Sequence, residues 1–360
     1  MSDFASCLIR WQRQHGRHDL PWQGADAYRV WLSEIMLQQT QVATVIPYYQ
    51  RFIASFPTIA ALAAATEEQV LTHWSGLGYY ARGRNLHRAA QLIAEKHHGE
   101  FPRQYEQILE LPGIGRSTAA AICALAYHEH RAILDGNVKR VLARYCGIAG
   151  WAGDKKIEEM LRREAEFLFP LPPGEGWGGG IRRRDNAIAT YTQALMDMGA
   201  TVCTRSKPKC SKCPVQTACV AYQTNRVHEL PTPRPRKAVP ERRATFLLLM
   251  HGNDILLEKR PGSGIWGGLW CPPQFDDEAA AKDWFVRNGM NASHGERLET
   301  FTHIFTHFKL HITPLKIQLS RKPLRAAQPG SVWLDVEEAL RAAIPAPVKK
   351  ILRTLHSAIP

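Results

Sequence analysis

The feature that most constrains this chain is a Pro-Gly-Ile-Gly turn, residues 112–115, between two apolar helical patterns. The first pattern ends at Leu111, and the second runs from Ser117 to Ala126. A proline and two glycines break a helix and permit a tight reversal, so the segment predicts two helices joined by a hairpin. Gly113 and Gly115 also let a ligand approach the backbone closely. The amide groups that open the second helix would then face an anion such as a DNA phosphate.

A single carboxylate follows this hairpin at the start of the next helical pattern. Asp135 comes after the apolar pair Ile133 and Leu134 and before a periodic apolar run that begins at Val138. It therefore lies at or near a helix N-terminus, where the helix dipole favours the ionised form. We expect Asp135 to stay negative at neutral pH, although an aspartate before a helix by itself is usually only a cap.

A second carboxylate lies inside an apolar helix. Tyr28 to Val42 predicts a helix whose apolar side chains cover most of its circumference. On a helical wheel Glu34 lies between Val30 and Trp31, with Leu37 one turn further on. Burial among hydrocarbon disfavours the charged form, so a glutamate here would hold its proton near neutral pH and act as a general acid. The alternative is a glutamate paired with an arginine from elsewhere in the fold.

Two other segments have residue types suited to nucleic acid. Residues 38–41, Gln-Gln-Thr-Gln, carry amides that can reach base edges. Trp74 to Leu86 interleaves aromatic residues, among them Tyr79, with arginines and glycines. Rings that wedge into a base stack, beside cations that bind phosphates, suit a protein that distorts a duplex. A polar helix face and a packed aromatic turn are the corresponding structural alternatives.

Four of the eight cysteines are close together in the sequence. Cys203, Cys210, Cys213 and Cys219 have the spacing C-x6-C-x2-C-x5-C among basic residues. In a chain with no secretion signal, four thiols this close predict a metal centre rather than disulfides. The spacing alone permits tetrahedral zinc or an iron–sulfur cluster. The remaining cysteines are scattered, and we interpret them as structural.

Composition limits the class of protein. The 360 residues are 45% apolar and 22% charged, which is typical of a globular protein of two or three domains. No run approaches the ~20 apolar residues of a membrane span, and the N-terminus lacks the features of a signal peptide, so we expect no membrane partner and a cytoplasmic, nucleoid-associated protein. The net charge of +13 attracts polyanions but does not separate DNA from RNA.

The pattern changes after residue 225. Residues 226–243 hold four prolines and six Lys and Arg, which predicts a stiff basic linker. Short alternating and apolar runs beyond it predict an α+β domain. Its expected strands are Thr245–Met250, Ile255–Glu258 and His311–Leu319, and its expected helices are Asp277–Arg287 and Val348–Leu355. Before the linker the patterns are helical, over Pro47–Phe56, Ile59–Ala65, Glu67–Trp74 and Tyr191–Met198, with a glycine-rich loop at 171–184.

In their order along the chain, these segments resemble the MutY family of adenine DNA glycosylases, part of the HhH-GPD superfamily. The matching segments are Trp31–Val42, Gly76–Arg82, Ile133–Arg140 and the cysteine loop. The resemblance implies a multidomain protein with an all-α HhH-GPD body over 1–225 and a 4Fe-4S cluster loop. The body would comprise a six-helix domain, 23–130, and a cluster domain, 1–22 with 131–225, and the active cleft would lie between them.

After the linker, residues 244–360 resemble a Nudix-like α+β domain, through 264–270 and 301–308. The Nudix hydrolase box, G-x5-E-x7-R-E-x2-E-E, is absent from the sequence. We therefore expect this domain to recognise the base opposite the target rather than to hydrolyse a pyrophosphate.

The resemblance also implies a reaction. A monomer would flip adenine out of a mispair with 8-oxoguanine or guanine in duplex DNA and excise it during base excision repair. Glu34 would protonate adenine N7, and anionic Asp135 would stabilise an oxocarbenium-like sugar, as the two carboxylates of glycosidases do. Asn137 would orient Asp135 or the attacking water. The four clustered cysteines would hold one 4Fe-4S cluster.

The resemblance assigns DNA contacts to Leu37, Gln38, Gln39, Tyr79, Gly113, Gly115, Ser117, Gln193, Phe305, Thr306 and His307. Tyr79 and Gln39 would wedge into the stack around the oxidised guanine. Ser117 stands where bifunctional relatives carry a Schiff-base lysine, which predicts a monofunctional glycosylase. Thr306 replaces the serine of the family's Phe-Ser-His segment, and its extra methyl group could alter discrimination against guanine.

Two alternatives remain. One is a pyrimidine-damage glycosylase and lyase of the endonuclease III type, which Ser117 and the large C-terminal domain oppose. The other is a non-catalytic DNA-binding protein that only senses damage, which the presence of both Glu34 and Asp135 opposes.

Overall fold

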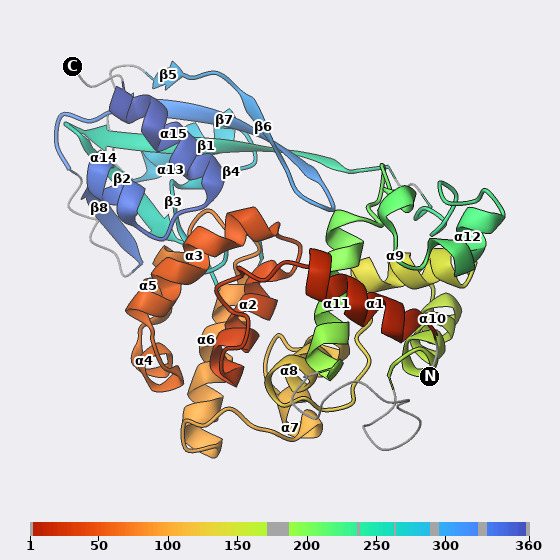
Figure 1. Cartoon of the computed structure of the whole chain (residues 1–360). Helices are drawn as coiled ribbons and strands as arrows, with labels where there is room; N and C mark the ends of the chain where they lie inside the picture. The colour runs from red at the N-terminus through yellow and green to blue at the C-terminus, as the bar shows by residue number, and fades with distance from the viewer. Residues whose placement is uncertain are drawn as a thin grey trace. The chain divides into compact units, whose positions relative to one another are not determined.

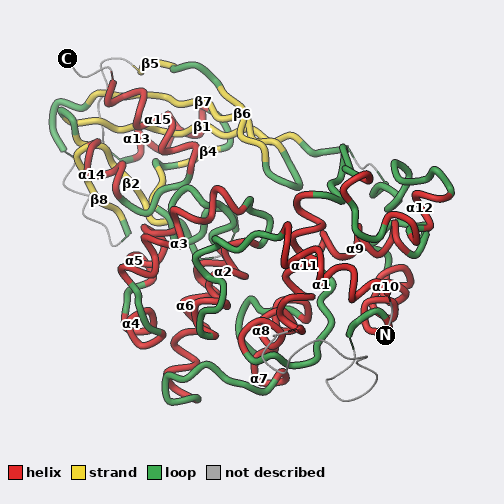
Figure 2. Tube along the Cα trace, viewed as in Figure 1, coloured by secondary structure: helices red, strands yellow, loops and turns green. Residues whose placement is uncertain are grey.

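The structure, a computed structural model, describes residues 3–170, 187–235, 238–262, 264–288, 295–322 and 330–357 (Figure 1). The chain forms two compact units. The first contains Met1–Ala63 and Arg88–Arg236, and the second contains Ala64–His87 and Lys237–Pro360. The first unit is helical, whereas the strands belong to the second (Figure 2). No helix among the described residues is both long enough and apolar enough to cross a bilayer.

The first unit is a helical body. Its helices are α1 (Asp3–His15), α2 (Ala27–Leu37), α3 (Val42–Ser55), α7 (Tyr105–Leu109), α8 (Arg116–Ala126), α9 (Gly136–Tyr145), α10 (Lys155–Phe167), α11 (Ala187–Thr201) and α12 (Val220–Gln223), with α4 (Ile59–Ala64) and α6 (Ala81–Lys96) at the boundary with the second unit. Helix α11 packs against α1, α8 and α9, and their apolar faces form one core around Tyr191. The predicted glycine-rich loop, 171–184, lies outside the described residues.

The predicted hairpin is present between α7 and α8. Gly113 has φ +82°, a left-handed backbone that favours glycine, whereas Gly115 is an extended N-cap residue with φ −99°. The predicted helix over Tyr28–Val42, however, is wrong in its last part. Helix α2 ends at Leu37, because Gln39 is left-handed with φ +56°, and α3 begins at Val42. Residues 38–41 therefore form a turn between two helices.

The second unit is built on one mixed sheet. Its strands are β1 (Glu241–His251), β2 (Asp254–Lys259), β3 (Trp270–Cys271), β4 (Gln274–Phe275), β5 (Gly295–Arg297), β6 (Phe301–Ile304), β7 (Lys309–Gln318) and β8 (Ser331–Asp335). The order is β3-β2-β1-β7-β5, with β4 on β1, β6 on β7 and β8 on β2, and β1 runs parallel to β7. The seven consecutive buried residues Ala244–Met250 make β1 the central strand, buried on both faces.

Helices α13 (Glu278–Arg287), α14 (Val336–Arg341), α15 (Ala346–Ser357) and α5 (Glu67–Trp74) complete this unit. The α+β domain predicted after the linker is confirmed. Residues 241–243, which the sequence places in the linker, are the first residues of β1 and pair with 309–311 of β7. The start of the predicted linker is also ordered, because Leu230 is buried and its carbonyl oxygen accepts a hydrogen bond from Arg144 at 2.8 Å.

Candidate active site

A cleft of about 970 Å³ lies within the helical unit, a size typical of ligand sites. Its walls come from the end of α2, the turn at 38–41, the start of α8, the start of α9 and one face of α11. The predicted residues that line it are Glu34, Leu37, Gln38, Gln39, Ser117, Asp135, Asn137 and Gln193. The structure therefore brings both predicted carboxylates together in one cleft.

Glu34 comes from the last turn of α2. Burial raises its pKa to about 7, and the negative charge of Asp135 contributes in the same direction. The pKa is thus raised in the direction that the sequence predicts. In the described part of the chain no arginine forms an ion pair with Glu34, so the structural alternative of an arginine partner has no support there.

Asp135 is the N-cap of α9. Its Oδ1 accepts a hydrogen bond from the Val138 amide at 2.7 Å, and its Oδ2 accepts one from Asn137 Nδ2 at 3.4 Å. The start of α9 favours the anion of Asp135, as expected, but burial has the larger effect on its pKa. Burial raises the pKa of Asp135, while the amides of Val138 and Asn137 and the charge of Arg140 lower it. Asp135 nonetheless has donors that stabilise its anion.

Arg140, which is not among the predicted site residues, connects the cleft to the cysteine loop. It lies one helical turn after Asn137 on α9, and its Nη2 donates to Asn137 Oδ1 at 2.8 Å. The same guanidinium donates to the carbonyl oxygens of Cys203, at 2.8 Å, and Gly199, at 2.6 Å. The spacing of Asn137 and Arg140 was a readable signal, because side chains three residues apart share a helix face.

A buried aspartate organises the part of the cleft wall that α11 contributes. Asp197 on α11 is 1% exposed and accepts hydrogen bonds from Gln12, at 3.0 Å, and Gln193, at 2.8 Å. It also binds the backbone amide and the guanidinium of Arg17. Arg17 and Gln193 both line the cleft. No sequence signal indicates this arrangement, because Arg17 and Asp197 are 180 residues apart in the chain.

The hairpin supports the cleft from the other side. The Leu134 amide donates to Ser117 Oγ at 3.1 Å, which fixes the backbone immediately before Asp135. Gln38 Nε2 reaches Thr118 Oγ1 at 3.4 Å. Gly115 is exposed, and a Cβ atom added there would meet nothing within 4 Å. The amide end of α8 is therefore open to a ligand.

Tyr79 and residues 305–307 belong to the second unit and do not line the cleft. Tyr79 is left-handed, with φ +48°, and 43% exposed, with the Arg82 guanidinium 5.5 Å from its ring centroid. The Phe305 ring stacks on Phe308 at 4.4 Å in the turn between β6 and β7. Thr306 and His307 are exposed in that turn.

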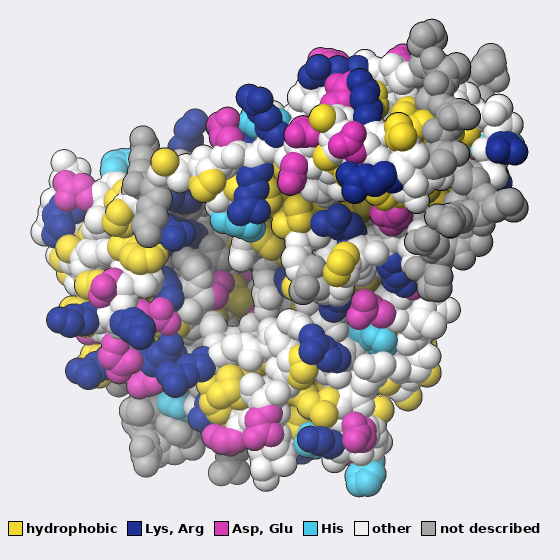
Figure 3. All heavy atoms as spheres, turned by 180° about the vertical axis from the view of Figure 1, so that it is seen from behind, with side chains coloured by type: hydrophobic (Ala, Val, Ile, Leu, Met, Phe, Trp, Pro, Cys, Tyr) yellow, Lys and Arg dark blue, Asp and Glu magenta, His cyan; other side chains and the backbone are white. Residues whose placement is uncertain are grey.

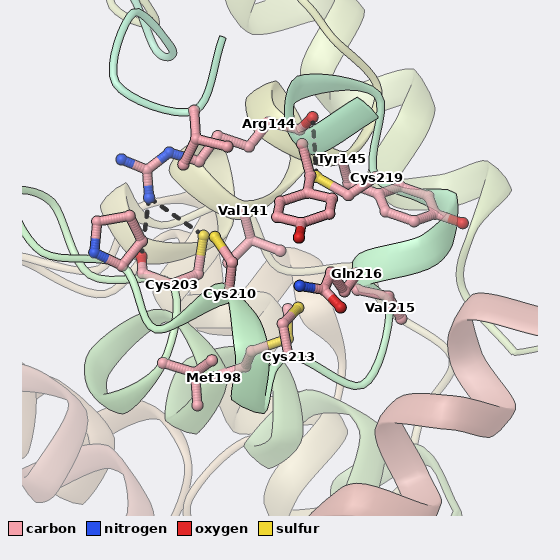
Figure 4. Close-up of a pocket in the computed structure, with 14 residues that line it drawn as sticks. Val141, Arg144, Tyr145, Met198, Cys203, Cys210, Cys213, Val215, Gln216 and Cys219 are labelled. Atoms are coloured by element: carbon pink, nitrogen blue, oxygen red, sulfur yellow. Dashed lines mark hydrogen bonds between the residues drawn. The ribbon is translucent and has the colours of Figure 1, made fainter. Parts of the chain in front are cut away.

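The four predicted metal ligands, Cys203, Cys210, Cys213 and Cys219, line one small cavity and are all free thiols (Figure 4). Arg144 contacts two of them: its Nη1 is 3.3 Å from Cys203 Sγ, and its carbonyl oxygen is 3.4 Å from Cys219 Sγ. Val141, Tyr145 and Met198 supply apolar walls. Within the described residues, no three His, Cys, Asp or Glu side chains form a group able to hold a metal ion.

Two family models match the chain. Residues 32–166 match the HhH-GPD superfamily base excision DNA repair protein, and residues 244–354 match the NUDIX domain. An adenine DNA glycosylase of Buchnera aphidicola is 38% identical over 99% of this chain and 98% of its own length. The Homo sapiens adenine DNA glycosylase is 34% identical over 99% of this chain and 74% of its own length.

Among solved structures, a thermostable thymine-DNA glycosylase aligns with a TM-score of 0.51 and 27% identity. The alignment covers 61% of this chain and 95% of that one. The helical body and the strand-containing C-terminal unit together agree with the two family matches, which confirms the predicted fold class.

Proposed function

The chain belongs to the adenine DNA glycosylase family, and we propose that it excises adenine specifically from mispairs with 8-oxoguanine or guanine in duplex DNA. Membership makes it a DNA N-glycosylase of base excision repair whose substrate is DNA. Both carboxylates of the cleft come from one chain, so the site needs no second copy and a monomer suffices.

One observation carries the proposed chemistry: two carboxyl groups face the same cleft, and within the described ranges hydrogen-bond donors meet the carboxylate of Asp135 but not that of Glu34. Glu34, with a pKa of about 7, donates its proton to N7 of the flipped adenine, which turns the base into a better leaving group. Asp135 stabilises the positive charge that develops on the sugar. Asn137, held by Arg140, orients Asp135 or the attacking water.

The part of the cleft lined by Arg17 and Gln193 suits a purine. Arg17 and Gln193 present hydrogen-bonding groups to the cleft, and Asp197 fixes both side chains. A base held by several fixed donors and acceptors is distinguished from bases that lack the matching groups, because these leave buried polar groups unpaired. We therefore assign Arg17 and Gln193 to recognition of the adenine edge.

The second unit recognises the base left behind. Tyr79 exposes its ring from a left-handed position, and the turn at Phe305–His307 exposes a hydroxyl and an imidazole. A ring can fill the gap in the stack, and short polar side chains can bind the distinctive edge of 8-oxoguanine. These features support assignment of the opposite-base contacts to this unit.

We also propose that the four cysteines hold one 4Fe-4S cluster, since all four line one small cavity with apolar walls. The cluster would cross-link the loop that Arg140 and Arg144 join to α9. Purified protein should be brown, with absorbance near about 400 nm from thiolate-ligated iron. A colourless protein that contains stoichiometric zinc would contradict this assignment.

The decisive experiment uses duplexes with adenine opposite 8-oxoguanine, adenine opposite guanine, and thymine glycol, and assays free base and strand cleavage separately. We expect adenine release from the first two and intact abasic strands, because Ser117 offers no amine for a Schiff base. Thymine glycol release with a borohydride-trapped adduct would instead identify a lyase of the endonuclease III type. Binding without release from any duplex would identify a damage sensor.

A further inference from the structure

Residues 64–87 belong to the same compact unit as the C-terminal sheet, although the HhH-GPD match spans 32–166. This segment contains α5 and the loop that carries Tyr79. The residue assigned to the gap in the stack is therefore held by the unit that also carries Phe305–His307. Specific side-chain contacts hold residues 64–87 against the C-terminal part of this unit.

Glu68 on α5 makes the main polar contact between this segment and the sheet. Its Oε1 accepts a hydrogen bond from the indole Nε1 of Trp270 at 2.6 Å, and its Oε2 pairs with Lys259 Nζ at 3.1 Å. The Lys259 ammonium also lies 5.3 Å from the Trp270 ring centroid. Burial opposes ionisation of Glu68, but the two hydrogen bonds and the charge of Lys259 outweigh it and lower its pKa. One carboxylate thus joins α5 to β2 and β3.

Two further hydrogen bonds hold the segment on either side of Tyr79. Before it, Ser75 Oγ donates to the Ile344 carbonyl oxygen at 3.0 Å. After it, the Arg84 guanidinium donates to the Gly267 carbonyl oxygen. The fit is close at Gly268, where an added Cβ would lie 2.9 Å from Glu67 Oε1. The Tyr79 loop is therefore fixed at both ends to the C-terminal part of the chain.

The same contacts continue to the turn at 305–307. Gly267 and Gly268 directly follow Trp266, which is 6% exposed and left-handed with φ +58°. The Trp266 ring packs against Phe305, with centroids 5.5 Å apart, and against His303 at 5.9 Å. A continuous set of packed groups thus runs from Glu68, through the loop at 264–270, to Phe305.

We propose that Glu68 is a positioning residue for specificity: by clamping α5 to Trp270 and Lys259, it keeps Tyr79 and the Phe305–His307 turn in a fixed relation for reading the base opposite adenine. This rests on the proposed preference for 8-oxoguanine. The substrate feature that depends on Glu68 is the oxidised edge of the opposite base, because the cleft that holds adenine lies in the other unit.

The test compares single-turnover adenine release from duplexes with 8-oxoguanine and with guanine opposite the target. Glu68→Ala should lower the ratio of the two rates about tenfold, as expected for loss of one charge-assisted hydrogen bond network, and leave the rate with guanine within twofold. Glu68→Gln keeps an acceptor for Trp270 and should recover part of the ratio. Glu337→Ala removes a comparable surface carboxylate, paired with Arg341, and serves as the matched control.

A double-mutant cycle with Tyr79→Ala separates positioning from general stability. If Glu68 acts through Tyr79, adding Glu68→Ala to Tyr79→Ala should lower the ratio no further. Trp270→Phe, which removes the indole N–H donor and keeps an aromatic ring, repeats the test should Glu68→Ala fail to fold. Equal losses on both duplexes, an unchanged ratio, or fully additive losses would each overturn the proposal. A wild-type protein that releases no adenine would instead overturn the proposed function.

Discussion

Glu34 and Asp135 share a cleft, but the protein surrounds them with different groups. Burial raises the pKa of both carboxyls. Asp135 receives the Val138 amide and is close to the charge of Arg140, so its anion is stabilised locally. Glu34 has the negative charge of Asp135 beside it, which disfavours a second anion. At neutral pH the favoured state therefore places the proton on Glu34 and the charge on Asp135.

The first prediction concerns the pH dependence of catalysis. Because Glu34 must be protonated to act as an acid and its pKa is about 7, single-turnover adenine release should fall about tenfold per pH unit well above pH 7. Glu34→Gln should lower the rate by roughly 10²–10⁴-fold and remove this limb. DNA affinity, measured by fluorescence anisotropy over the same pH range, is the control. A rate that rises with pH above 7 would rule out Glu34 as the acid.

The second prediction concerns the stability cost of the same group. The pKa of Glu34 is about 7 in the folded state, against an ordinary value of 4.5 for an exposed glutamate, so between these values the folded state binds a proton that the unfolded state lacks. Raising the pH through this window therefore destabilises the fold. Glu34→Gln removes the titration, so it should raise the melting temperature more at pH 8 than at pH 4. Equal changes at both pH values would show that Glu34 does not titrate differently on folding.

Some of these residues were predictable and others were not. Glu34 was, because helical periodicity alone places it between Val30 and Trp31, both buried. Asp135 was predictable as a cap, but the degree of its burial depends on tertiary packing. The link between Asp197 and Arg17 was not, because it joins chain positions 180 residues apart and leaves no local pattern.

At the scale of elements, the hairpin between α7 and α8 followed from its glycines, because proline and glycine act locally. The break between α2 and α3 did not, since the polar run at residues 38–41 is compatible with one face of a continuous helix, while the backbone turns at Gln39. The left-handed backbone of Gln39 and Tyr79 is the kind of local strain found at functional sites. Polar or aromatic residues in such positions give no warning in the sequence.

The third prediction tests the amide end of α8. Gly115 is the N-cap, is exposed and has room for a side chain, so Gly115→Asn and Gly115→Asp should both fold with an unchanged or higher melting temperature. If the first amides of α8 bind a DNA phosphate, the aspartate should weaken DNA binding at least tenfold more than the isosteric asparagine, because like charges repel. Anisotropy titrations with both variants measure this difference. Equal affinities would place the phosphate elsewhere.

At the scale of the whole molecule, the proposed function assigns catalysis to the helical unit and recognition of the opposite base to the second unit. The order of motifs along the sequence predicted a helical body with a cysteine loop, followed by an α+β domain. It did not predict that residues 64–87 group with the C-terminal sheet, because that assignment depends on individual side-chain pairs such as Glu68 with Trp270. On the face drawn in Figure 3, Lys and Arg side chains are dispersed among acidic ones rather than gathered in a single patch.

The fourth prediction follows from the net charge of +13. Phosphate contacts release counterions and are shared by damaged and undamaged duplexes, whereas contacts to base edges release none. Affinity for both duplexes should therefore fall with parallel slopes, at least tenfold between roughly 50 and 200 mM salt, and the ratio of the two affinities should stay constant. Anisotropy titrations of duplexes with and without an adenine–8-oxoguanine pair, using Glu34→Gln to prevent turnover, measure both slopes. A ratio that collapses with salt would mean that the recognition of 8-oxoguanine is itself carried by charge. That recognition would then belong to the arginines beside Tyr79 rather than to the exposed turn at Phe305–His307.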